Sequence, residues 1–473
     1  MPTHFSFPLS PEQQSAVNQM VDFFQSGKDI FILSGHAGTG KTTLVKGLIK
    51  YLETEKIPSR LMASTGRAAK VLSMKTALKA ETMHRYIYTM SLHEIDEKSE
   101  KVNIDFRLRE NKDAPETIYF VDESSMLSDQ RSLNVSLNFG SGKLLTDMLL
   151  FAGQRKIVFI GDPAQLPPVN YLFSPALNPD YFSKYFSKQV GSFSLKGIHR
   201  FGSETGIGRN VRDMQQKIND ATFPYLSIRV TGNNDMHICP SEEALARTYA
   251  ESIRKLGIDN CIMLSFSNKM ANSLNTQVRQ KLFGRNTFKV NKGELLVVIQ
   301  NNYKHSLYNG DHLEILEVSD STETRAGIVF RNVKARALSQ GNYMVFEGKV
   351  IDTLLNSDMQ NLDTKQDFEL MRDFFIRAKQ LGIKRNSPNF TNFMLSDPYL
   401  NALRVKYGYA ITCHKAQGGE WQHVFVALEP VLFVQDKQFT YRWIYTAVSR
   451  AMNEVLLEAK GVEAARIPEI VDA

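Results

Sequence analysis

The stretch "GHAGTGKTT", from Gly35 to Thr43, directly follows the apolar run "DIFILS" and directly precedes "LVKGLIKYL". Its spacing, one glycine, four residues and then Gly40-Lys41-Thr42, fits the phosphate-binding loop GxxxxGK[ST]. In such a loop backbone N–H groups point at phosphates, and the following helix presents its positive dipole end to them. Apolar residues recur at helical spacing after the loop. The stretch therefore predicts a strand, a phosphate-binding loop and a helix, with a nucleoside triphosphate as ligand.

Two further apolar runs end in acidic or polar residues. In "TIYFVDES" four apolar residues are followed by Asp122 and Glu123, and in "FIGDPAQLPPV" the run leads into Gly161-Asp162 and then Gln165. Ligands of open α/β sheets bind at the carboxyl ends of the strands. We therefore expect both segments to lie beside the phosphate-binding loop.

The residue types predict a role for each side chain in ATP hydrolysis. Lys41 is expected to contact the β- and γ-phosphates, and the Thr42 hydroxyl and Asp122 to hold Mg²⁺. Glu123 is expected to orient and deprotonate the attacking water, and Gln165 to reach the γ-phosphate. The remaining loop residues predicted to bind ATP are Gly35, Ala37, Gly38, Thr39, Gly40 and Thr43.

Composition is typical of a globular protein that does not cross a membrane. The 473 residues are 42% hydrophobic and 23% charged, and 57 Lys and Arg against 50 Asp and Glu give a net charge of +7. This charge permits a polyanionic partner without requiring one. Cys239, Cys261 and Cys413 have no metal-ligand spacing, which favours buried thiols in a reducing compartment. With no signal pattern and no apolar run near the length of a membrane span, we expect a soluble, cytoplasmic protein.

Two sets of short apolar runs, each followed by a helical pattern, predict two α/β cores with parallel sheets. The first set is "DIFILSG", "SRLMAST", "TIYFVDES" and "KIVFIGDPAQ", and the second is "NCIMLSFSN", "KYGYAITCHKAQG", "QHVFVALEP" and "NEVLLEAK".

Three segments interrupt these cores. Between Tyr86 and Ala114 the residues Val102, Ile104, Phe106 and Leu108 alternate with polar ones, which predicts a hairpin strand, with a solvated loop as the alternative. Residues 303–400 begin with β-rich text and become helical around "FELMRDFFIRAKQLGIK". The segment "SLNFGSGKLLTDMLL", from Ser136, is interpreted as an extended flexible loop.

These segments occur among motifs whose order resembles that of superfamily 1 helicases of the RecD/Dda branch. "LSPEQQSAV" resembles the Q motif, "GHAGTGKTT" motif I, "MASTGRAAKVL" motif Ia, "ETMHRYI" motif Ib, "VDESS" motif II and "GDPAQLPPV" motif III. Further along the chain "LKGIHR" resembles motif IV, "YAITCHKAQGGEW" motif V and "YTAVSRA" motif VI. The resemblance covers almost the whole chain and implies an ATP-dependent helicase that moves 5′ to 3′ on single-stranded DNA.

The resemblance adds residues to the nucleotide site. It implies that Gln13 reads adenine, that Arg200 and Arg450 reach the γ-phosphate as arginine fingers from the second core, and that Glu420 contacts the ribose. It also implies a set of DNA-binding residues, in which hydroxyls, histidines and a lysine meet phosphates and bases. They are Ser64, Thr65, His84, Phe106, Thr412, His414 and Lys415. Phe106 is the candidate wedge that splits a duplex, with packing of the hairpin as its alternative role, and a satisfied structural histidine is the alternative for His84 and His414.

The implied fold class is α/β, with two RecA-like parallel-sheet cores and two inserts. Residues 1–85 and 116–196 are assigned to the first core, 86–115 to a pin-like insert, 197–302 and 401–473 to the second core, and 303–400 to an SH3-like β insert with a helical flank. Implied partners are single-stranded DNA, single-strand to duplex junctions and replication or recombination proteins, with the chain acting as a monomer.

Two other functions remain compatible with the sequence. The same motor acting on RNA is one alternative, because a 2′-hydroxyl can be tolerated or read. The other is a nucleotide-switched scaffold that binds nucleic acid and uses hydrolysis only to release a partner. Motifs Ia and V have no purpose in a simple switch, which favours the helicase.

Overall fold

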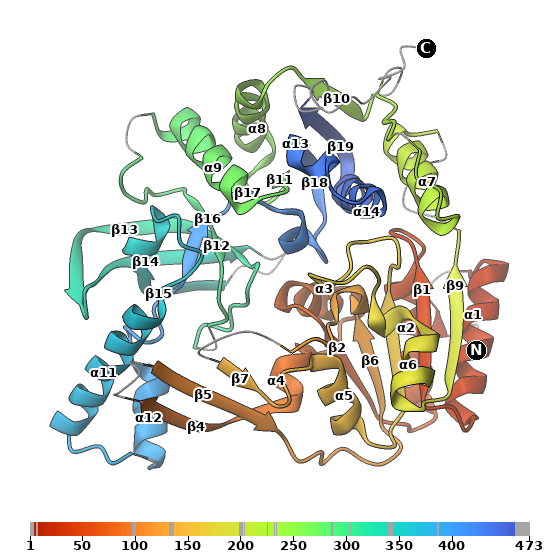
Figure 1. The fold of residues 1–473 in the computed structure, drawn as a ribbon, viewed down its shortest axis with the longest axis horizontal. Helices are drawn as coiled ribbons and strands as arrows, with labels where there is room; N and C mark the ends of the chain where they lie inside the picture. Colours follow the sequence, from red (N-terminus) through yellow and green to blue (C-terminus); the bar gives the residue numbers. More distant parts are fainter. Residues whose placement is uncertain are drawn as a thin grey trace.

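A computed structural model describes residues 4–5, 8–96, 101–131, 137–197, 202, 204–224, 226–230, 232, 234–284, 287–302, 304–338, 344–385 and 387–458, with backbone alone at 90–96, 101–104 and 137. Figure 1 shows two α/β lobes, one above the other, with a β-rich part beside them. None of the helices in the described ranges combines the length and apolar character that a membrane crossing requires.

The first lobe contains a six-stranded sheet in which every pairing is parallel. Its strands, in spatial order, are β3 (Ala80–Thr82), β2 (Ser59–Ala63), β6 (Ile118–Asp122), β8 (Ile157–Gly161), β1 (Ile30–Gly35) and β9 (Val190–Leu195). Its helices are α1 (Pro11–Gln25), α2 (Lys41–Thr54), α3 (Gly66–Thr76), α4 (Met83–Ile87), α5 (Leu144–Ala152) and α6 (Pro179–Phe186). Both faces of the sheet are buried, which explains the unbroken apolar runs in the sequence.

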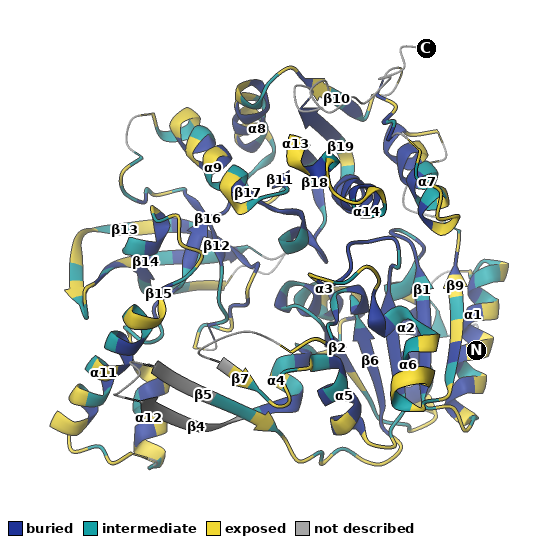
Figure 2. Cartoon of the chain, viewed as in Figure 1, coloured by how far each residue is buried: buried dark blue, intermediate teal, exposed yellow. Residues whose placement is uncertain are grey.

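The second lobe contains a five-stranded parallel sheet. Its strands, in spatial order, are β10 (Met236–Cys239), β19 (Ala451–Glu458), β18 (Trp421–Val426), β11 (Cys261–Ser265) and β17 (Ala410–Thr412). Its helices are α7 (Gly206–Asn219), α8 (Glu242–Leu256), α9 (Asn268–Phe283), α13 (Pro430–Phe433) and α14 (Lys437–Val448). The two predicted sets of parallel strands are thus confirmed. Figure 2 shows these strands largely buried, with exposed residues on the outer sides of α1, α6 and α8.

A five-stranded antiparallel sheet, here called the β module, packs against the second lobe. Its strands, in spatial order, are β15 (Met344–Ile351), β14 (Ile328–Leu338), β13 (His312–Arg325), β12 (Leu295–Val298) and β16 (Val405–Tyr407), and its helices are α10 (Asp352–Leu355), α11 (Thr364–Gln380) and α12 (Pro388–Ser396). The β-rich and helical parts agree with the sequence pattern. Strands β12 and β16 lie outside residues 303–400, so the sheet extends beyond that range at both ends.

A three-stranded sheet projects from the first lobe. Strands β4 (Tyr88–Asp96) and β5 (Lys101–Leu108) form an antiparallel hairpin, and β7 (Leu137–Phe139) pairs parallel to β5. The hairpin interpretation of this segment is therefore correct, and the solvated-loop alternative is not. Helix α11 of the β module lies against β5 (Figure 1).

The prediction of an extended loop from Ser136 to residue 150 is wrong, because most of this segment is β7 and the start of α5. The Asp147 carboxylate, which is fully buried, accepts hydrogen bonds from the Ser141 N–H at 3.0 Å and the Tyr88 hydroxyl at 2.6 Å. It thereby closes the glycine-rich turn before the helix. The sequence interpretation relied on the two glycines of this segment. The structure depends instead on the long-range hydrogen bond between Asp147 and Tyr88.

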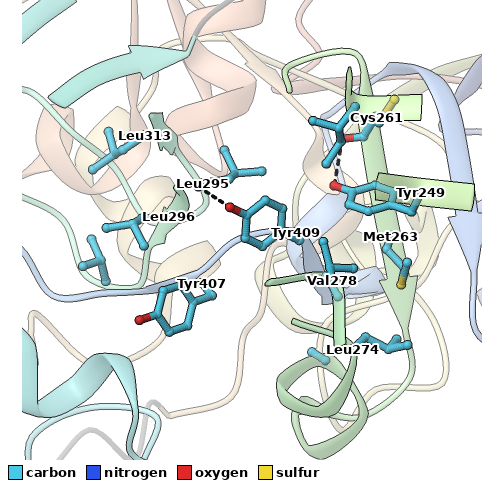
Figure 3. Close-up of a cluster of buried hydrophobic side chains, with 14 of the residues drawn as sticks. Tyr249, Cys261, Met263, Leu274, Val278, Leu295, Leu296, Leu313, Tyr407 and Tyr409 are labelled. Carbon is cyan, nitrogen blue, oxygen red and sulfur yellow. Dashed lines mark hydrogen bonds between the residues drawn. The ribbon is translucent and has the colours of Figure 1, made fainter. Parts of the chain in front are cut away.

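The second lobe and the β module share one hydrophobic core, shown in Figure 3. At its centre the Tyr409 hydroxyl accepts a hydrogen bond from the Leu295 N–H at 3.0 Å and donates one to the Glu294 carboxylate at 3.0 Å. Glu294 is fully buried and binds Arg279 of α9, with 2.9 Å between Oε1 and Nη2. The Arg279 guanidinium stacks on the Tyr407 ring, 3.6 Å from its centre. This ion pair therefore joins α9 to the start of β12 in the β module.

Removing the carboxylate of this pair should destabilise the chain strongly. Glu294→Ala leaves the buried Arg279 cation uncompensated, so the free energy of unfolding should fall by about 3–5 kcal/mol. Urea unfolding of the variant measures this loss. Glu243→Ala is the matched control, because Glu243 pairs with Lys281 of the same helix at 3.0 Å but is exposed. The control should change stability little, and equal losses in both variants would contradict the assignment.

Candidate active site

The phosphate-binding loop lies between β1 and α2, as its sequence predicts. Gly38 and Gly40 have φ of +84° and +86°, which side chains other than glycine rarely adopt. At Gly35 a Cβ atom would lie 2.7 Å from Thr39 Oγ1, so this position has no room for a side chain. The Lys41 ammonium donates to the carbonyls of Gly35 at 2.7 Å and His36 at 2.9 Å. The loop is thereby folded around its own lysine, with Thr42 and Thr43 following in the first turn of α2.

Gln13 contacts this loop from the first turn of α1. Its side chain donates to the Thr39 carbonyl at 3.3 Å and also completes a capping box with Ser10. A Cβ atom at Gly40 would approach Gln13 Nε2 to 2.9 Å, so the two residues are in direct contact. The structure brings Gln13 to the nucleotide site, and its reading of adenine remains a prediction.

The two acidic residues after β6 lie close to the loop. Thr42 hydrogen-bonds the Asp122 carboxylate, and the charge of Lys41 acts on both Asp122 and Glu123. Burial raises the pKa of Asp122. Burial and then the neighbouring Asp122 charge raise the pKa of Glu123 to about 7. A carboxyl group with this pKa can accept a proton near neutral pH.

The residues after β8 form a buried polar cluster around Asp162. Its carboxylate accepts hydrogen bonds from the Ala164 N–H at 2.9 Å and Gln165 Nε2 at 3.4 Å, and lies 3.3 Å from His36 Nδ1. Burial acts to raise the pKa of Asp162, but the contacts with His36, the charge of Lys41 and the Tyr445 hydrogen bond together hold the pKa well below its usual range. The Gln165 Oε1 atom is buried and has no hydrogen-bond partner within the described ranges. It is available to a group that enters the site.

The second lobe completes the site through α14. The Tyr445 hydroxyl donates to Asp162 Oδ2 at 2.7 Å and accepts from the Ala37 N–H of the phosphate-binding loop at 3.2 Å. One residue later, Thr446 Oγ1 accepts from the Leu166 N–H at 3.1 Å. The sequence analysis did not single out Tyr445. Its position five residues before Arg450 within "YTAVSRA" was the available signal, but tyrosines at such positions are more often core residues.

Arg450 and Glu420 have partners of their own. The Arg450 guanidinium is buried and donates to the carbonyls of Thr446 at 3.2 Å and Gly419 at 3.3 Å, and its charge acts on Glu123 across the lobe boundary. Glu420 Oε1 lies 3.1 Å from Lys75 Nζ of α3, so it bridges the lobes at the far end of that helix. Arg200 lies outside the described residues.

Most of the predicted DNA-binding residues lie on two helix starts at the lobe boundary. The Ser64 hydroxyl donates to the Glu123 carbonyl at 2.9 Å, and Thr65 caps α3. Across the boundary lies the 3₁₀ turn Cys413–Ala416, which contains His414 and Lys415 and directly follows Thr412. The following turn packs on α3, because a Cβ atom at Gly418 would lie 3.1 Å from Ala68 Cβ. The turn that follows the second group therefore meets the helix that Thr65 caps, at the boundary between the lobes.

His84 and Phe106 lie apart from these helix starts, at the base of the hairpin. Phe106 stacks on Phe139 with ring centres 4.5 Å apart, and His84 meets the same ring edge-on at 5.1 Å. Burial lowers the pKa of His84 to about 4. These contacts agree with the alternative roles, in which Phe106 packs the hairpin and His84 is a structural histidine.

The fold and the site define a P-loop nucleoside triphosphatase built from two α/β lobes. A model of the AAA domain matches residues 8–226, and a model of the UvrD-like helicase C-terminal domain matches residues 407–457. The chain is 23% identical to ATP-dependent DNA helicase dda of Enterobacteria phage T4, over 94% of this chain and 98% of that protein. It is 32% identical to ATP-dependent DNA helicase Pif1 of Bdellovibrio bacteriovorus, over 36% of this chain and 35% of that protein.

A solved Pif1 helicase structure, from work on DNA unwinding at forked double-stranded DNA by two coordinating Pif1 helicases, has the same fold, with a TM-score of 0.50 and 16% identity over 98% of this chain and 95% of that one. These findings confirm the resemblance inferred from the motifs. The chain is similar to superfamily 1 DNA helicases of the RecD/Dda-like branch.

The half-buried His84, packed beside Phe139, makes stability depend on pH. Its pKa is about 4 in the folded chain and about 6.5 in an unfolded one, so the unfolded state binds more protons between these values. The free energy of unfolding should therefore fall as the pH is lowered from about 6.5 towards about 4. In His84→Phe, urea unfolding across this range should show a shallower pH dependence. An unchanged dependence would contradict the burial of this imidazole.

Proposed function

We propose that this chain is an ATP-dependent DNA helicase that translocates 5′ to 3′ on single-stranded DNA and unwinds duplexes. The observation that carries the proposal is the Tyr445 hydroxyl, which binds the phosphate-binding loop of one lobe from the other lobe. A nucleotide that enters between these groups changes contacts on both lobes. The T4 relative, whose name states an ATP-dependent DNA helicase, matches the chain over nearly its full length.

The residues of the site fit ATP with Mg²⁺. Loop N–H groups and Lys41 suit the phosphates, and the oxygen ligands of Thr42 and Asp122 are those that Mg²⁺ prefers. Bound Mg²⁺ would neutralise phosphate charge and orient the terminal phosphate. Glu123 accepts a proton from the attacking water, and the unpartnered Oε1 of Gln165 helps to hold that water.

In this proposal two second-lobe arginines compensate charge that develops in the transition state. Arg450 already acts electrostatically on Glu123, and Arg200 is the second finger implied by the family. Gln13 reads adenine. Glu420 leaves its ion pair with Lys75 and contacts the ribose. Because the arginines belong to the opposite lobe, the bound triphosphate draws the lobes together and hydrolysis releases them.

Single-stranded DNA is proposed to follow the edge formed by the two helix starts. On one lobe, phosphates would meet the hydroxyls and N–H groups of Ser64 and Thr65. On the other lobe they would meet the Thr412 hydroxyl, the His414 imidazole and the Lys415 ammonium. Lys415, which is half-buried, donates to Asn268 at 3.3 Å, and it would meet a phosphate with the exposed part of its side chain. Lobe movement then shifts one group of strand contacts relative to the other.

The architecture is proposed to be that of a helicase with two RecA-like cores. The first lobe corresponds to residues 1–85 and 116–196, and the second to residues 197–302 and 401–473. The hairpin within residues 86–115 acts as the pin that blocks one strand, and the β module around residues 303–400 corresponds to an SH3-like insert. His84 and Phe106 support the base of the pin through Phe139, and Phe106 is the candidate for contact with the junction.

Strand separation on tailed duplexes tests the function and its polarity together. A duplex with a 5′ single-stranded tail should be opened in the presence of ATP and Mg²⁺, and one with a 3′ tail should not. Lys41→Ala should abolish opening because it removes the phosphate charge clamp, while binding of single-stranded DNA should persist.

Three results would contradict parts of this proposal. Preferential opening of 3′-tailed duplexes would refute the polarity. Activity on RNA but not on DNA would favour the RNA motor. ATP hydrolysis without strand separation on any substrate would favour the nucleotide-switched scaffold.

A further inference from the structure

Arg442 of α14 is a buried cation that the site described so far does not use. The residue is 8% exposed, and its Nε and Nη1 atoms have no hydrogen-bond partner within the described part of the chain. Burying part of a charge without partners is costly, and an anion that binds there would offset the cost.

The position of Arg442 on the helix directs it toward the first lobe. Tyr445 and Thr446, which follow three and four residues later, both contact that lobe. Residues at these spacings share one helix face. Arg442 therefore belongs to the face of α14 that meets the phosphate-binding loop and the segment after β8.

Asp162, the carboxylate whose charge acts on Arg442, does not satisfy this guanidinium. Burial lowers the pKa of Arg442, and the charge of Asp162 opposes that shift only in part. Asp162 Oδ1 already contacts the Ala164 N–H and His36, and Oδ2 already accepts from Tyr445 and Gln165. Within the described ranges no hydrogen bond joins Arg442 to this carboxylate.

Arg442 and Lys41 approach the same carboxylate from opposite lobes. The charge of Lys41 acts on Asp162 from the phosphate-binding loop, and that of Arg442 acts on it from α14. Tyr445, one turn after Arg442, binds both this carboxylate and the Ala37 N–H of the loop, so a phosphate held by the loop comes close to the same face of α14. Arg450 differs from Arg442, because its Nε, Nη1 and Nη2 atoms all have partners within the second lobe.

We infer that Arg442 is a phosphate ligand, which binds the terminal phosphate of the triphosphate from the second lobe. This inference rests on the proposed ATP site and adds a residue to it. It gives a role to the two buried guanidinium nitrogens that have no partner within the described ranges, and it makes α14 sensitive to the presence of a third phosphate.

Equilibrium binding of fluorescent nucleotides tests the inference without relying on turnover. The probes are mant-AMPPNP, which has three phosphates and is not hydrolysed, and mant-ADP, each with Mg²⁺. Arg442→Met should weaken mant-AMPPNP binding by roughly 10-fold or more, since a charge-assisted contact is lost, and should change mant-ADP binding much less. Arg442→Lys should retain part of the affinity, and Arg247→Met, at an exposed position on α8, should bind both probes normally.

Thermal unfolding of the nucleotide-free variants separates this role from a structural one. Replacing an unpartnered buried cation by an apolar side chain of similar volume should leave the melting temperature of Arg442→Met unchanged or raise it. A lowered melting temperature with equal losses for both probes would overturn the inference in favour of a structural role. Unchanged binding of mant-AMPPNP would also overturn it. A wild-type chain that binds mant-AMPPNP but separates no strands would refute only the proposed helicase function.

Discussion

The hydroxyl of Tyr445 is the contact on which the arrangement of the site depends. It donates to Asp162 after β8 and accepts from the Ala37 N–H in the phosphate-binding loop, so one oxygen atom connects two first-lobe segments to the second lobe. Both contacts are buried, where an unmade hydrogen bond costs most. Changes in the loop are therefore transmitted to α14 through a short and direct connection.

A second connection lies along α3, away from the phosphates. Arg67 stacks over the Trp421 ring at 4.1 Å and hydrogen-bonds His312 Nδ1 at 3.2 Å. Burial, with a further contribution from the Arg67 charge, lowers the pKa of His312 to about 3, so its ring is neutral and its other nitrogen can donate to the Gly408 carbonyl. Helix α3 thus contacts the second lobe and the β module together. Lobe movement that begins at the nucleotide site has to be accommodated around this helix.

The sequence predicted the elements whose signals are local. Apolar runs ending in Gly35, Asp122 and Gly161 are strands at one sheet edge because buried parallel strands read as continuous apolar text. The sequence pattern could not predict features that depend on distant contacts. Asp147 organises α5 through Tyr88, and Tyr445 reaches a loop about four hundred residues earlier in the chain. The same limit applies to Arg442, whose lack of partners becomes visible only when its surroundings are folded.

The central claim is that nucleotide binding and release move the two lobes relative to each other. Energy transfer between fluorophores on Ser183→Cys of α6 and Glu251→Cys of α8 measures this directly, because both positions are exposed and the three native cysteines are buried. On single-stranded DNA the transfer efficiency should differ between the nucleotide-free and AMPPNP-bound states, and should alternate between two values during ATP turnover. One constant efficiency in all three conditions, in a chain that hydrolyses ATP, would contradict the account.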